Sequence, residues 1–164
     1  MSKETIEQAI ANGDPIKALN WKEPFASLML PPMSKVETRT WLTHIRGLVL
    51  ICTSLKAYDT TDMYDLCGGQ GQTVEIRRLL KENSPFSFDQ RNGGLLGKAI
   101  AIGRLVDCRK LRKDDKHFLL WEDGMEERYA HIYEDVHPIE PFAFKGGQKW
   151  KIVTDEVRSQ IKLL

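Results

Sequence analysis

The chain has 164 residues, of which 41% are hydrophobic and 29% are charged, with 24 basic and 23 acidic side chains. A chain of this length fits one domain that buries about 70% of its unfolded surface. The balanced charge excludes a global attraction to nucleic acid or to a membrane, so any such preference must come from a local patch. No segment has the apolar core of a signal peptide or approaches the about 18 apolar residues of a membrane span. We therefore expect a single soluble domain over residues 1–164, in the cytoplasm and without a membrane partner.

The cysteines and histidines give no sign of a metal centre. Cys52, Cys67 and Cys108 are an odd number at wide spacing without a Cys-x-x-Cys pair, which indicates reduced thiols. No His-x-x-x-His or carboxylate-paired spacing occurs among His44, His117, His131 and His137. We therefore expect no metal and no cofactor.

The first third of the chain alternates helices and strands. Ile6, Ala9 and Ile10 lie at helical spacing, and Pro24 suits the first turn of a second helix. The run GLVLICTS is continuously apolar, which is typical of a strand buried on both faces. The predicted elements are helices over residues 3–12 and 23–30, and strands over residues 16–21, 34–41 and 47–54.

Residues 58–92 are predicted to be a helical insertion. Ile76, Leu79 and Leu80 give residues 73–83 a helical core stripe, whereas the preceding GGQGQ predicts a flexible loop. A helix after such a loop could present N–H groups to an anion, but the dinucleotide-binding fingerprint is incomplete. Because the insertion is long, it is a candidate lid over a neighbouring cleft.

The second half of the chain predicts mainly strands. Residues 95–111 give the longest strand signal, and their Ala99, Ala101 and Gly103 form a small-residue face that predicts close packing of another element. Two prolines in residues 128–142 predict a strand that bends or lies at an edge. A short strand over residues 149–153 and a helix over residues 154–164, with Thr154 as N-cap, complete the chain. The fold class is therefore α+β, a small mixed β-barrel with helical insertions and flanking N- and C-terminal helices.

The segment SKVETRTW carries the most informative side chains. In a strand, Glu37, Arg39 and Trp41 share one face, with neighbours about 6–7 Å apart. A carboxylate, a guanidinium and an indole can together hold a flat polar ligand. Exposed ion pairs are common and contribute only about 0–1 kcal/mol, so alternation alone favours a structural pair with Trp41 in the core.

Two other motifs give weaker signals. NGGLLGKA lacks the spacing of a phosphate-binding P-loop and places Ala99 where a hydroxyl is needed, which indicates a turn entering a strand. CRKLRKDDK carries five basic residues, and such charge runs are usually solvated loops, with phosphate contact as the alternative.

The order of three segments, ALNWKEPFASLML, SKVETRTW and HIRGLVLICTS, resembles the ASCH family, a branch of the PUA-like fold. The resemblance covers about residues 16–153 and also includes GKAIAIGRLVDCRKL and the closing strands. Its specificity lies mostly between residues 18 and 54. The matching positions are Trp21, Pro24, Ala26, Ser27, Glu37, Arg39, Trp41, Arg46, Gly47 and Ser54.

The resemblance implies a PUA-like barrel whose cleft is lined by the Glu-x-Arg strand. It implies a nucleic-acid-binding module, RNA-binding above all, whose cleft recognises a nucleotide or modified base. The partners are then RNA or DNA, or a free modified nucleoside. The nucleotide-binding candidates are Trp21, Lys22, Glu37, Arg39, Trp41, Arg46 and Ser54.

The resemblance also leaves two other functions open. One small branch of the family hydrolyses the acetyl group of acetylcytidine with a lysine, a threonine and a glutamate, so a nucleoside amidohydrolase or a ribonuclease is an alternative. Here Ser34 replaces the family lysine and Glu37 stands at the threonine position, which disfavours that activity. Lys35 shares the parity of Glu37, and these two residues are the catalytic candidates. A transcription-coactivator-like interaction module is the third possibility.

Overall fold

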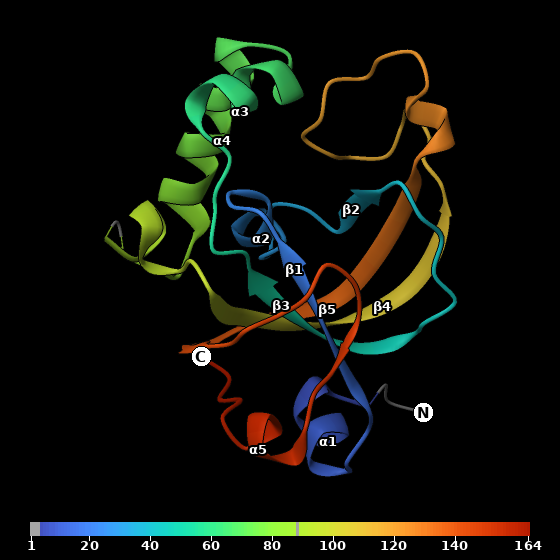
Figure 1. The fold of residues 1–164 in the computed structure, drawn as a ribbon, viewed down its shortest axis with the longest axis vertical. Helices are drawn as coiled ribbons and strands as arrows, with labels where there is room; N and C mark the ends of the chain where they lie inside the picture. The colour runs from blue at the N-terminus through green and yellow to red at the C-terminus, as the bar shows by residue number, and fades with distance from the viewer. Residues whose placement is uncertain (1–3, 88) are drawn as a thin grey trace.

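The computed structural model describes residues 4–87 and 89–164 and has an α+β fold (Figure 1). Its strands are β1 (Ile16–Trp21), β2 (Val36–Arg39), β3 (Gly47–Thr53), β4 (Lys98–Lys110), β5 (Tyr129–Ala143) and β6 (Lys151–Ile152). Its α-helices are α1 (Ile6–Ala11), α2 (Phe25–Leu28), α3 (Thr60–Cys67), α4 (Gln70–Asn83) and α5 (Asp155–Arg158). Short helical turns span Gln90–Gly94 and Met125–Glu127. The strands form one mixed sheet in the order β2-β5-β4-β3-β1-β6, in which β1 and β3 are parallel.

The sheet carries a hydrophobic core on each face. Along β3, Leu48 and Leu50 pack on one face with residues of α1, whereas Val49 and Ile51 pack on the other face with Trp21 and other residues. This two-sided burial explains the continuous apolar run, since alternate side chains of a strand point to opposite faces. The predicted buried strand is therefore confirmed.

The long antiparallel pair of β4 and β5 supports the centre of the sheet. A Cβ added at Gly103 of β4 would lie 2.7 Å from Val136 Cγ2 of β5, so the predicted close packing at this glycine is confirmed. β5 pairs with β2 only through residues 129–132 and continues beside β4 with several register shifts. Pro138 and Pro141 stand in this second part, beyond the pairing with β2, where a missing N–H costs no bond to that strand.

The sheet is not closed into a barrel, which corrects the predicted architecture. Within the described residues, β2 and β6 form the two edges and share no backbone hydrogen bonds. β6 contains only two paired residues, and the segments beside both edges are irregular. The edges nevertheless approach each other, because the ring centroids of Trp41 and Trp150 lie 6.0 Å apart. Side chains therefore bridge a gap that backbone pairing leaves open.

The insertion forms two helices that pack beside α2. Asp59 caps α3 by accepting a hydrogen bond from the Asp62 N–H at 2.8 Å, a signal that the sequence reading missed. α4 begins at Gln70, so the prediction of a flexible loop over GGQGQ is wrong beyond the two glycines at 68 and 69. Leu28, Met63, Cys67 and Ile76 form the small core that joins α2, α3 and α4.

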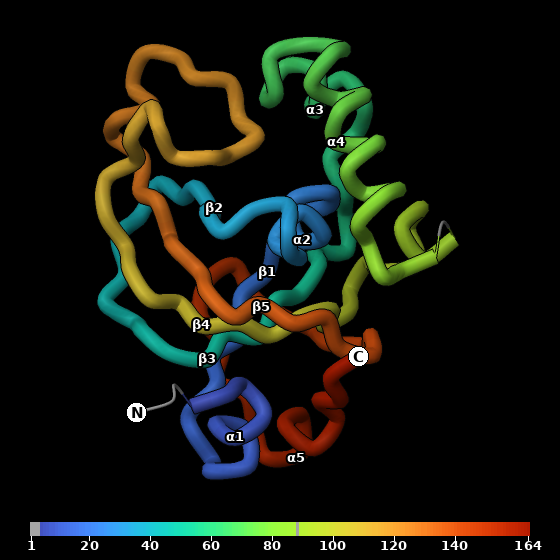
Figure 2. The backbone as a smooth tube through the Cα atoms, turned by 180° about the vertical axis from the view of Figure 1, so that it is seen from behind, coloured from blue at the N-terminus to red at the C-terminus, as the bar shows by residue number. Residues whose placement is uncertain are grey.

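The terminal helices lie together at one end of the molecule (Figures 1 and 2). Thr5 forms a capping box with Gln8 at the start of α1, and Thr154 caps α5 as predicted, although α5 ends at Arg158. The Arg158 guanidinium donates to the Ile10 carbonyl at 3.0 Å, which joins the two helices. In the described part of the chain, no helix has the length and apolar character needed to cross a membrane.

Candidate functional site

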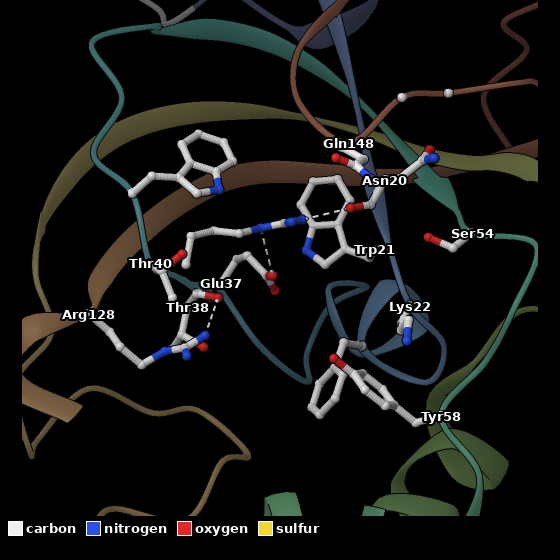
Figure 3. A pocket seen from close by; sticks show the side chains of 15 residues that line it. Asn20, Trp21, Lys22, Glu37, Thr38, Thr40, Ser54, Tyr58, Arg128 and Gln148 are labelled. Carbon is white, nitrogen blue, oxygen red and sulfur yellow. Dashed lines mark hydrogen bonds and ion pairs between the residues drawn. The ribbon is translucent and has the colours of Figure 1, made fainter. Parts of the chain in front are cut away.

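A cavity of ≈ 560 Å³ opens between β1, β2 and the loop that follows β5 (Figure 3). Six of the seven predicted nucleotide-binding residues line it, although they come from three separate segments of the chain. These residues are Trp21, Lys22, Glu37, Arg39, Trp41 and Ser54. The remaining lining residues are Asn20, Phe25, Thr38, Thr40, Tyr58, Arg128, Gly146, Gly147 and Gln148.

Glu37 and Arg39 form an ion pair in the wall of this cavity. Arg39 Nε lies 3.1 Å from Glu37 Oε1, and Arg39 Nη2 donates to the Asn20 carbonyl at 2.7 Å. The guanidinium also lies over the rings of Trp21 and Trp41, at 5.2 and 5.8 Å from their centroids. Arg39 is thus held on several sides, and such a preorganised fork loses little freedom when it binds an acceptor.

The environment of Glu37 favours its neutral form. The side chain is 14% exposed, and burial raises the pKa of Glu37 to about 7, against the lowering effects of Arg39, the Trp21 indole and Arg128. Tyr133 packs in the core beside Trp21, with 5.9 Å between their ring centroids, and burial raises the pKa of its phenol. Glu37 therefore exchanges a proton near neutral pH, so it can accept or donate a hydrogen bond.

Trp41 follows the end of β2 and is held by its neighbours. Its ring meets those of His131 and Trp150 edge to face, at 4.9 and 6.0 Å between centroids. The Nε2 atom of His131 lies 2.9 Å from the Trp41 carbonyl oxygen, and burial lowers the pKa of this histidine. Trp41 thus has one part packed against the core and another in the cavity wall, and its role in holding a ligand stays a prediction.

Aromatic and basic side chains surround the rest of the cavity (Figure 3). The Lys22 ammonium lies 4.7 Å from the ring centroid of Tyr58, and the Tyr58 ring meets that of Phe25 edge to face at 5.6 Å. Across the cavity, Arg128 Nη2 donates to the Thr38 carbonyl at 3.3 Å. Two cations therefore lie on opposite sides of the Glu37–Arg39 pair, where they can attract an anionic ligand.

Asn20 and the loop after β5 complete the wall. The Asn20 Oδ1 atom is buried and has no hydrogen-bond partner among the described residues. A Cβ at Gly146 would overlap this amide oxygen, so the glycine lets the backbone lie directly against Asn20. The loop thereby brings Gly147 and Gln148 to the cavity.

Two predicted site residues lie elsewhere. Lys35 is exposed and does not line the cavity, because the Ser34 hydroxyl turns back onto the Val36 backbone and Lys35 precedes the strand. Arg46 donates to the carbonyls of Thr43 and Ile45 at 3.0 and 2.8 Å, and its Nη2 lies 3.8 Å from Asp107 Oδ1 of β4, so its guanidinium holds its own loop against the sheet. Lys35 is therefore not placed beside Glu37 in the cavity, contrary to the expectation. Among the described residues, Lys22 is the lysine that lines the cavity.

The sequence reading missed residues that reach the cavity through long-range pairing. Arg128 enters because Arg39 pairs with Tyr129 in the register of β2 and β5. The polar Asn20 within an apolar strand and the Gly-Gly pair at 146 and 147 were usable signals. From the insertion, Tyr58 lines the cavity, but no described residue of 60–92 does, so the helices flank this site rather than cover it.

No group of three or more histidine, cysteine or acidic side chains suited to a metal ion occurs in the described ranges. The polar groups of the cavity are instead those that hydrogen-bond an organic ligand. In comparisons with known proteins, no protein-family profile matches the chain, and a search of curated proteins finds no match. The fold and the cavity are therefore the basis for a functional assignment.

Proposed function

We propose that this chain is an ASCH-like module of the PUA-like class that binds nucleic acid, RNA above all, with a nucleotide or modified base in the Glu37 cavity. The observation that carries the proposal is the Glu37–Arg39 ion pair, set between tryptophan rings in a cavity of ≈ 560 Å³. The resemblance of SKVETRTW and its flanking segments to the ASCH family supports the same function.

The chemistry of the cavity suits a base better than an apolar ligand. Glu37 can accept a hydrogen bond from an exocyclic amino group, and Arg39 can donate to a base or phosphate oxygen. Aromatic faces stack on bases with a gain of about 1–3 kcal/mol per base. Lys22 and Arg128 offer charge to the phosphates that flank the bound nucleotide.

The test compares Arg39→Ala with Arg109→Ala in fluorescence anisotropy with a labelled single-stranded RNA of mixed sequence. Arg109 also pairs with a carboxylate, at 2.7 Å from Asp115, but does not line the cavity. We expect Arg39→Ala to weaken binding at least about tenfold, since a charged hydrogen bond contributes roughly 1.5–3 kcal/mol. Arg109→Ala is expected to bind like the parent protein, and thermal unfolding checks that both variants fold. Equal affinity of the two variants would refute the proposal.

A hydrolase acting on an acylated nucleoside is the second candidate, because the pKa of Glu37 lies near 7. In this reaction Glu37 takes a proton from the attacking water, whose oxygen bonds to the acyl carbon. The proton then passes to the departing nitrogen as the carbon–nitrogen bond breaks. Chromatography of acylated nucleosides incubated with the protein tests this candidate. Turnover that persists in Glu37→Gln, or no turnover by the parent protein, excludes it.

A further inference from the structure

Two more cavities extend from Tyr58 along α4. The first, of ≈ 200 Å³, is lined by Tyr58 together with residues of α3, α4 and the segment before α3. The second, of ≈ 690 Å³, lies between α4 and the turn at Gln90–Gly94. Tyr58 also lines the Glu37 cavity, and Arg77, Leu80 and Arg91 line both of the further cavities. Each hollow is therefore adjacent to the next, from the Glu37 cavity to the side of α4.

The side of α4 that faces these cavities is basic. Arg77 and Lys81 both line the second cavity and stand four residues apart, so they are neighbours on one helix face. In the described residues neither forms an ion pair, whereas Arg78 is bound by Glu75 at 2.5 Å and Glu82 at 2.6 Å. The acidic residues of α4 are therefore occupied by Arg78. The positive charges of Arg77 and Lys81 remain, and because they repel each other, an anion that binds both is favoured.

The carboxylates near this path are engaged by the protein itself. Asp59 accepts the Asp62 N–H at the start of α3, at 2.8 Å. Glu23 accepts hydrogen bonds from the Ser27 N–H at 3.0 Å and the Ser27 hydroxyl at 2.6 Å. Burial also raises the pKa of Glu23, which favours its neutral form. The cavity of ≈ 200 Å³, which Glu23 and Asp59 both line, therefore repels a bound anion less than two free carboxylates would.

We infer that these two cavities bind the phosphodiester chain of a single-stranded nucleic acid whose base occupies the Glu37 cavity. The strand passes Tyr58 and runs along α4, where Arg77 and Lys81 contact its phosphates. This inference rests on the proposed function and adds a direction to it. It also gives the 58–92 insertion a role as an extension of the binding surface.

The experiment measures binding of a labelled RNA of about 12 nucleotides, within the range of single-strand sites, and of a nucleoside monophosphate mixture. The variant is Arg77→Glu/Lys81→Glu. The control, Lys116→Glu/Lys162→Glu, changes the net charge equally at exposed residues that line none of the three cavities. We expect the variant alone to lose about tenfold in RNA affinity. Its plot of log affinity against log salt should flatten by about 1.4, since each single-strand phosphate contact contributes about 0.7.

Nucleoside monophosphate binding separates this inference from the proposed function. If the inference is correct, Arg77→Glu/Lys81→Glu binds monophosphates like the parent protein, because the Glu37 cavity is intact. Equal RNA affinity and salt slope in the variant and the control overturn the inference while the proposed function stands. RNA binding that responds to the α4 variant but not to Arg39→Ala refutes the base site instead. Preferential binding of polyglutamate over RNA overturns the assignment of the partner.

Discussion

The ionisation of Glu37 makes the stability of this protein depend on pH in a predictable direction. Burial raises the pKa of Glu37 from 4.5 to about 7 in the folded state, so the folded protein holds its proton more tightly than the unfolded chain. The stabilisation is complete below pH 4.5 and is lost as the pH rises through 7. A shift of this size corresponds to about 3 kcal/mol, since one pKa unit is about 1.4 kcal/mol. For a protein of this length, that is roughly 6–12 °C in melting temperature.

The assay is urea unfolding of the parent protein and of Glu37→Gln between pH 4.5 and 7.5 at constant ionic strength. The glutamine keeps the shape of the side chain and removes its titration, so the difference between the two proteins isolates Glu37 from Glu23, whose pKa is also raised. We expect Glu37→Gln to gain about 3 kcal/mol relative to the parent protein across this range. Parallel stability profiles, or a gain in the opposite direction, would refute the reasoning.

Two further predictions follow from the packing. Gly146→Ala places a Cβ on the Asn20 amide and must displace the loop, so it should weaken RNA binding about tenfold while unfolding shifts by less than about 1 kcal/mol; unchanged affinity in the anisotropy assay would contradict this role of the loop. The three thiols are free and buried, and burial raises the pKa of Cys52 and Cys67. A maleimide should therefore label the native protein far more slowly than the urea-unfolded chain, and rapid labelling of one thiol would count against the packing around it.

Local patterns predicted the centre of the sheet well. The apolar run of β3 is readable from the sequence because a strand with a core on each face has no polar side. The close packing at Gly103 was predictable because β5 leaves no room there for a side chain. Glu37 and Arg39 could be placed on one wall because their spacing needs only strand alternation. These features depend on neighbours in the sequence.

The rest of the site depends on partners far along the chain. Arg128 and Gln148 reach the cavity through the register of β5 and the loop beyond it, which no local pattern encodes. Lys35 was misplaced because parity assumes a strand from Ser34 onward, whereas the Ser34 turn delays the start of the strand to Val36. Whether the sheet closes into a barrel depends on how far β6 extends. With only two paired residues, β6 gives too weak a sequence signal to predict that length.

The pairing of β2 with β5 sets when the cavity can assemble during synthesis. Glu37 pairs with His131, so the strand that holds Glu37 and Arg39 gains its partner only after more than half of the chain has been made. The parallel partners β1 and β3 and the antiparallel strand β4 all come earlier, and β1 supplies Trp21 to the cavity wall. Contacts this distant in sequence form slowly, and domains fold as their last elements leave the ribosome. A nascent chain that ends before β5 therefore has most of a hydrophobic sheet but lacks the complete Glu37 cavity.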